Sequence, residues 1–150
     1  MIKVSDVLNA MESLAPVERK MDFDNVGLLV GNIDNTVEKI IVALDITDNV
    51  IEEACKEKAQ LIVSHHPVFF QLKSVTAQDI LGRKVLNLAA NGISAICMHT
   101  NLDVSVGGVN DALANAIGIE NTKPMSETGV GEDGIAYGFG RYGTVERQPI

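Results

Sequence analysis

The sequence predicts an α/β layer fold with a mainly parallel β-sheet. Between residues 40 and 118, short apolar runs alternate with segments of helical periodicity, which is the pattern of strands joined by crossover helices. The chain has 150 residues, of which 46% are hydrophobic and 21% charged, enough for one domain with its own core. We therefore expect residues 1–150 to form a single α/β domain.

Four apolar runs predict the strands of this sheet. The run at residues 40–44 is continuously apolar, as is typical of a strand buried on both faces. The other predicted strands cover residues 28–30, 61–63 and 93–98. The tail at residues 129–143 mixes glycine with apolar residues and predicts a Gly-rich strand or turn region.

Helices are expected where apolar residues recur every three or four positions. Ser5 followed by Asp6 is expected to cap the first helix, and Thr47 to cap the second. Asn91 and Gly92 are expected to end the third through a left-handed stop. The third and fourth predicted helices span residues 77–90 and 108–117.

Composition and charge exclude several functional classes. The net charge of −8 argues against nucleic acid as a partner, because an acidic surface repels phosphate backbones. The two cysteines fit no disulfide framework, the N-terminus shows no signal peptide and no apolar run is long enough to span a bilayer. These observations predict a cytoplasmic protein without membrane association. The last strand-like stretch has no helix after it, which suggests that a following segment is absent.

Polar side chains gather where three predicted strands end. Asp45 follows the strand at 40–44, His65 and His66 follow the strand at 61–63, and His99 and Asp103 follow the strand at 93–98. Ligands bind beyond the carboxyl ends of parallel strands, so these groups are expected at one edge of the sheet. They include all three histidines of the chain.

Imidazole and carboxylate groups in this arrangement indicate a metal site. Consecutive histidines in an extended segment point in different directions, so two neighbouring metal ions suit His65 and His66 better than one. Asp103 would complete the coordination of one of them. These ligands suit Zn, Fe, Mn or Ni, and two metals roughly 3.5–4 Å apart can activate a water molecule.

The remaining polar groups near the predicted edge have other interpretations. Asp45 is expected to cap the following helix rather than to bind metal, and Cys97 is expected to face the core. Thr100 and Asn101, together with His99, are candidates for supporting the ligands or contacting a substrate. The pattern Asp22-x-Asp24 lacks the remaining ligands of a calcium loop.

Five sequence blocks then resemble the GTP cyclohydrolase 1 type 2 homologue family, also called the Nif-three-like proteins. The resemblance covers nearly the whole chain, with Phe23 where the family often carries Trp. The Ser-His-His-Pro and His-Thr-Asn-Leu-Asp blocks in tandem are the most specific. The blocks are Asp24-Asn25-Val26-Gly27-Leu28-Leu29-Val30-Gly31, Ser64-His65-His66-Pro67, His99-Thr100-Asn101-Leu102-Asp103, Gly107-Gly108-Val109-Asn110-Asp111 and Gly140-Arg141-x-Gly143.

This resemblance implies an α/β/α fold, a dinuclear metal centre and a toroidal homohexamer. It implies that His65 binds one metal, while His66 and Asp103 bind the other. The family completes its site with a histidine and a bridging glutamate near the C-terminus. This chain has no histidine after His99, so it is expected to be the N-terminal metal-binding part of a longer fold, with a site that its own residues leave incomplete.

The sequence therefore predicts a dinuclear-metal-dependent hydrolase acting on a nucleotide-like substrate. The family name suggests opening of the guanine imidazole ring of GTP. The alternative is a ring-forming scaffold or regulatory module in which the metals serve assembly or sensing without catalysis. An α/β domain whose histidines have no function is the third interpretation.

Overall fold

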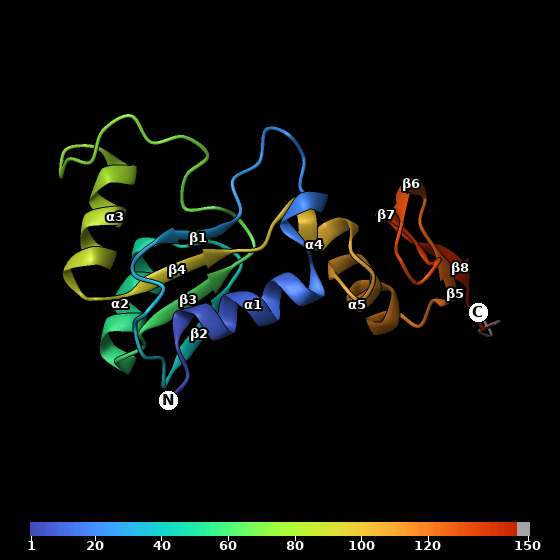
Figure 1. Ribbon diagram of the computed structural model, residues 1–150, viewed down its shortest axis with the longest axis horizontal. Coiled ribbons are helices and arrows are strands. Elements are labelled where there is room, and N and C mark those ends of the chain that lie inside the picture. Colours follow the sequence, from blue (N-terminus) through green and yellow to red (C-terminus); the bar gives the residue numbers. More distant parts are fainter. Residues whose placement is uncertain (147–150) are drawn as a thin grey trace.

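The computed structural model describes residues 1–146 and centres on a four-stranded sheet with helices on both faces (Figure 1). The strand order is β1-β4-β3-β2; β2, β3 and β4 are parallel, and β1 is antiparallel to β4. The predicted α/β layered fold with a mainly parallel sheet is confirmed. Residues 147–150, which end the chain, lie outside the described part. The strands are β1 (Gly27–Val30), β2 (Ile40–Ala43), β3 (Leu61–Ser64) and β4 (Ser94–Cys97).

Successive side chains of each strand point to opposite faces of the sheet, where they join two separate hydrophobic cores. Val63 pairs with Ile96, and both belong to the core that α1 (Val4–Leu14) covers. Ile62 pairs with Ala95, and both belong to the opposite core. β3 and β4 are therefore buried on both faces, and apolar residues fill most of each strand.

The first helix begins two residues earlier than expected, because its N-cap is Lys3 and not Ser5. α1 starts at Val4, and the backbone N–H of Lys3 donates to the carboxylate of Asp6 over 2.8 Å. Asp6 thus caps the helix from within its first turn, and Ser5 is not the cap. Val4, Val7 and Met11 anchor α1 on the sheet.

Helices α2 (Asp48–Glu57) and α3 (Ile80–Ala90) cover the other face of the sheet. Thr47 caps α2 by accepting a hydrogen bond from the backbone of Val50, which confirms the predicted start. α3 begins at Ile80 rather than at residue 77, because the Asp79 side chain caps it. Gly92 has a φ of +65°, which confirms the left-handed stop.

The strand at residues 40–44 differs from its prediction. β2 lies at the edge of the sheet, and one of its faces is open: Val42 is 80% exposed and Ile40 is also exposed. An apolar run cannot by itself distinguish a strand buried on both faces from an edge strand with an uncovered face.

The C-terminal third packs beside the sheet as two short helices and two small sheets (Figure 1). The helix directly after β4 was not predicted, because five residues are too few to show a period. Glycines 131 and 134 form the turn between β6 and β7, as the Gly-rich pattern suggested. These elements are α4 (Thr100–Val104), α5 (Val109–Ala116), β5 (Glu120–Lys123), β6 (Ser126–Val130), β7 (Ala136–Phe139) and β8 (Tyr142–Thr144).

None of the helices described between residues 1 and 146 is long and apolar enough to cross a membrane. The longest, α1 and α3, have 11 residues each, whereas a spanning helix needs about 20.

Candidate metal centre

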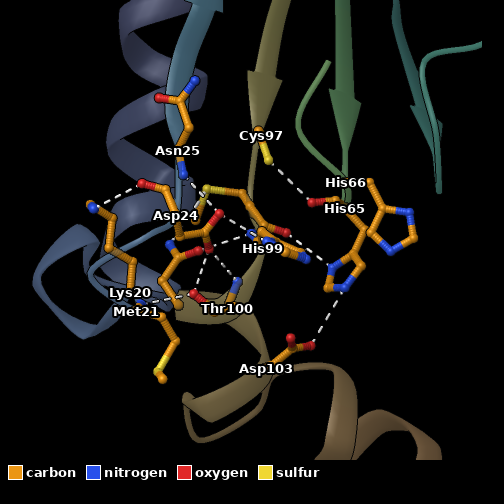
Figure 2. A network of polar contacts seen from close by, with 12 residues as sticks. Lys20, Met21, Asp24, Asn25, His65, His66, Cys97, His99, Thr100 and Asp103 are labelled. Carbon is orange, nitrogen blue, oxygen red and sulfur yellow. Dashed lines mark hydrogen bonds and ion pairs between the residues drawn. The ribbon is translucent and has the colours of Figure 1, made fainter. Parts of the chain in front are cut away.

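The carboxyl ends of β3 and β4 bring the three histidines together (Figure 2). His65 and His66 follow β3 directly, and His99 lies between β4 and α4. The ring centroids of His65 and His66 are 5.0 Å apart, and the His99 ring lies 5.1 Å from the first and 5.6 Å from the second. One ring nitrogen from each histidine lies within 4.8 Å of the other two, so the three could share a cation.

Each of the three rings has its Nδ1 atom paired with an oxygen. His65 Nδ1 lies 3.1 Å from the carbonyl oxygen of Met98, His66 Nδ1 lies 2.8 Å from Asp45 Oδ1, and His99 Nδ1 lies 2.9 Å from Asp24 Oδ1. In the neutral imidazole, such a bond places the proton on Nδ1 and makes Nε2 the nitrogen with a free lone pair. Metal-binding histidines are commonly held by this type of contact.

Asp103 reaches the cluster from the first turn of α4 (Figure 2). Its Oδ1 lies 3.5 Å from His65 Nε2. Its backbone oxygen accepts a hydrogen bond from the side chain of Asn110 over 2.8 Å, which fixes the end of α4 against α5. The resemblance implied that Asp103 shares a metal with His66, whereas the contact that the structure shows is with His65.

Asp45 does not cap α2, contrary to the sequence-based expectation. Thr47 occupies the capping position, and the carboxylate of Asp45 instead contacts the His66 ring over 2.8 Å. Both side chains are about half exposed. An acid directly after a strand was ambiguous in sequence, because helix caps and active-site acids both occur there.

Asp24 is the residue of this site that sequence reasoning missed. Its side chain is completely buried, and it accepts hydrogen bonds from the His99 ring, the backbone and hydroxyl of Thr100, and the backbone of Asn25 (Figure 2). Burial raises the pKa of Asp24, but the hydrogen bonds from Thr100, His99 and Asn25 together outweigh it and lower the pKa below its ordinary value. A buried, ionised carboxylate therefore fixes the orientation of His99. Its position in the first block of the family motif was the available sign of importance.

Thr100 and Asn101 hold neighbouring segments of the site in place through hydrogen bonds. Thr100 is buried and also accepts a hydrogen bond from the backbone of Met21 over 2.9 Å. Asn101 is buried as well; its Oδ1 accepts from the backbone N–H of His99, and its Nδ2 donates to the carbonyl of Ala15. Both side chains hold backbone segments in place and neither is open to a substrate.

Cys97 points into the interior beneath the histidines. It is 1% exposed, and its Sγ donates to the carbonyl oxygen of His65 over 3.1 Å. Burial, together with the negative charge of Asp24, raises the pKa of Cys97 to about 12. A thiol of this kind stays protonated, which agrees with its predicted place in the core.

Comparison with known sequences gives a consistent result. Residues 2–149 match the sequence model of the Duf34/NIF3 (NGG1p interacting factor 3) family. The GTP cyclohydrolase 1 type 2 homolog of Clostridium acetobutylicum is 40% identical over 138 residues, which cover 87% of this chain and 52% of the relative. The protein of the same name from Methanocaldococcus jannaschii is 35% identical over 91% of this chain and 56% of its own. The chain thus spans about half the length of these relatives.

Solved structures agree with the sequence matches. A Bacillus cereus protein related to NIF3 superposes with a TM-score of 0.80 at 34% identity, covering 85% of this chain and 35% of the other. Reduced HcgD from Methanocaldococcus jannaschii superposes with a TM-score of 0.76 at 34% identity, covering 86% and 52%. Most of this chain therefore shares its fold with these two solved structures.

Proposed function

This chain belongs to the Duf34/NIF3 (NGG1p interacting factor 3) family, and we propose that it forms the metal-binding part of a metal-dependent hydrolase acting on a nucleotide-like substrate. The observation that carries the proposal is the meeting of three imidazoles whose Nδ1 atoms are all paired with oxygen. That arrangement directs the Nε2 lone pairs to an external partner.

The donor set fits divalent transition metals. We propose that His65, His66 and Asp103 hold two ions between them, with His99 adding a third imidazole beside them. Imidazole and carboxylate ligands suit Zn, Fe, Mn or Ni. The carboxylates of Asp24 and Asp45 lie behind two of the rings and add negative charge that favours a cation.

Bound divalent ions would supply a hydroxide at near-neutral pH and an electrostatic hold on a developing oxyanion. The task of the chain's own residues is orientation. Asp24 and the Met98 carbonyl fix the rings of His99 and His65, and α4 delivers the Asp103 carboxylate to the same edge. In this proposal the end of β3 supplies His65 and His66, and the short helix after β4 supplies Asp103.

Metal content per chain tests the ligand assignment. We expect the purified chain to bind zinc or manganese, and His66→Ala or Asp103→Ala to lose at least one equivalent of it with the fold intact. Asp133→Ala provides the control, because this exposed carboxylate lies in the turn between β6 and β7. Metal analysis beside a circular dichroism spectrum measures both quantities. Unchanged metal content in both site variants would reject the assignment.

Turnover tests the hydrolase part of the proposal. The relatives carry the name GTP cyclohydrolase 1 type 2 homolog, so GTP is the first substrate to test, with release of formate and of inorganic phosphate as readouts. The relatives are about twice as long as this chain, so the assay compares this chain with one that carries the equivalent of their second half. Full metal loading with no turnover in either form would favour a scaffold that binds metal without catalysis.

We also propose that the protein assembles as a ring-shaped homohexamer, as the family resemblance implies. The uncovered face of β2 supports a contact with a second copy of the chain, because Val42 in this strand and Leu44 directly after it are 80% and 62% exposed. Light scattering coupled to gel filtration measures the mass in solution. A monomer at all concentrations would contradict the assembly without affecting the metal site.

A further inference from the structure

Two phenylalanine rings stand in solvent beside the histidine cluster. Phe23 is 65% exposed and Phe70 is 52% exposed, although the chain contains only four phenylalanines and no tryptophan. Their ring centroids are 6.4 Å apart, and the Phe70 ring lies 5.9 Å from the His99 ring. Aromatic side chains are usually among the most deeply buried in a fold, so exposed rings at the rim of a polar site indicate a binding function.

The turn that carries Phe23 is fixed at both ends. The backbone N–H of Asp24 donates to the carbonyl of Met21, which closes the turn. Met21 is in turn bonded to the Thr100 hydroxyl, and the Asp24 side chain is buried against Thr100 and His99. Phe23 therefore lies on a turn whose neighbours are both anchored to α4, so its outward position is a consequence of the fold.

The loop that carries Phe70 is held in a similar way. Val68 is buried and Phe69 packs against the same core, so the loop is anchored just before Phe70. The Asn25 side chain donates to the carbonyl of Phe69 over 2.9 Å and ties this loop to the one that carries Phe23. The two rings therefore come from separate segments that a direct hydrogen bond connects.

The rings meet at 50° and so form a corner rather than a parallel pair. A planar ring can stack on one phenylalanine and meet the other with its edge, which are the two favoured geometries between aromatic groups. Such a ring would lie next to His99, whose ring is within 5.6 Å of both other histidines. Polar groups attached to that planar ring would then reach the histidine cluster.

We propose that Phe23 and Phe70 form an aromatic corner that binds the planar heteroaromatic ring of the substrate beside the histidine cluster. This inference rests on the proposed function, because it names the part of a nucleotide-like substrate that the protein contacts outside the metal ligands. Stacking on an aromatic face tolerates different bases, because every base has a π-face. The corner therefore selects a base-containing compound over a sugar phosphate without discriminating strongly between bases.

Ligand binding by the whole chain tests this corner. GMP serves as the probe, and ribose 5-phosphate serves as the matched compound without a base; titration calorimetry and ligand-observed NMR measure both affinities. We expect GMP to bind more tightly than ribose 5-phosphate. Phe23→Ala and Phe70→Ala should each weaken GMP binding by roughly 5- to 150-fold, the range that stacking of one base contributes, and leave ribose 5-phosphate binding unchanged.

Three controls separate the aromatic role from other effects. Phe70→Leu keeps an apolar side chain but removes the ring, and should weaken GMP binding in the same way as Phe70→Ala. Tyr142→Ala removes an aromatic side chain of β8 that is 56% exposed, and should leave GMP affinity unchanged. Because Phe23 and Phe70 are exposed, their variants should keep the thermal midpoint of the parent, which circular dichroism checks.

The titrations are repeated after removal of metal with EDTA, which separates this inference from the proposed function. The corner consists of protein alone, so the preference for GMP over ribose 5-phosphate should survive metal removal. If the purified chain binds no metal, the proposed function is refuted, but the chain should still prefer GMP to ribose 5-phosphate. Equal affinity of the parent for GMP and ribose 5-phosphate, or unchanged GMP affinity in the Phe23→Ala and Phe70→Ala variants, would overturn the aromatic corner.

Discussion

Replacing Asp24 by asparagine should destabilise the protein by about 2–4 kcal/mol. The carboxylate is completely buried and accepts hydrogen bonds from Asn25, His99 and Thr100, the last through both its backbone and its hydroxyl. A hydrogen bond to a charged group contributes about 1.5–3 kcal/mol net, and an unpaired buried donor costs about 1–3 kcal/mol. Asparagine keeps the shape but replaces one accepting oxygen with a donating NH₂, so at least one donor loses its partner.

Urea denaturation at neutral pH measures this change, and the thermal midpoint should fall by about 5–15 °C for a chain of this size. Asp22→Asn is the control, because Asp22 lies two residues earlier and is exposed. Nitrogen NMR of the histidine rings adds a second readout: the Nδ1–H form of His99 should dominate in the parent and lose that dominance in the variant. A loss of stability below about 0.5 kcal/mol, within the range of ordinary surface substitutions, would refute the reasoning.

Three further substitutions or treatments test other parts of the fold. The Asp111 carboxylate is bonded to Arg141, which lowers the pKa of Asp111. At pH values above 3.8, the ordinary pKa of this carboxyl, Asp111→Asn should lower the free energy of unfolding by about 1–3 kcal/mol. The difference between parent and variant should vanish as the pH falls through the lowered pKa, and urea titrations at several pH values measure it. A thiol reagent at mildly alkaline pH should modify exposed Cys55 in the native protein but reach buried Cys97 only after unfolding, so two fast-reacting native thiols would contradict this burial. Gly31→Ala should destabilise more than Gly27→Ala, because both have positive φ but only the added Cβ of Gly31 would meet a side chain, at 2.3 Å; equal losses in thermal midpoint would contradict this.

Much of the sheet could be predicted because its strands are strongly patterned. The buried runs that became β3 and β4 are apolar on both faces, and the groups that follow them lie together as the rule for parallel strands requires. The edge position of β2 could not be predicted, because strand order depends on contacts between distant segments. The short helix α4 was missed for a local reason: its five residues do not complete a recognisable period.

The histidines of the site could be found from sequence, but the residues that orient them could not. Asp24 and His99 are 75 positions apart, and only the folded chain brings their side chains within 2.9 Å. Asp45 was expected to cap a helix because it follows a strand and precedes a helix. Its contact with His66 depends on the register between β2 and β3 and could not be predicted from that position. The assignment of individual ligands to individual metal ions remains a prediction.

The three histidines differ in what lies behind them, and this makes them unequal as electron donors. His65 is backed by a neutral peptide carbonyl, His66 by a half-exposed carboxylate and His99 by a buried one. A carboxylate behind an imidazole pushes more electron density toward the opposite nitrogen than a carbonyl does. A cation at this edge would therefore meet three inequivalent imidazole donors, and the neutral carbonyl leaves His65 the least polarised of the three.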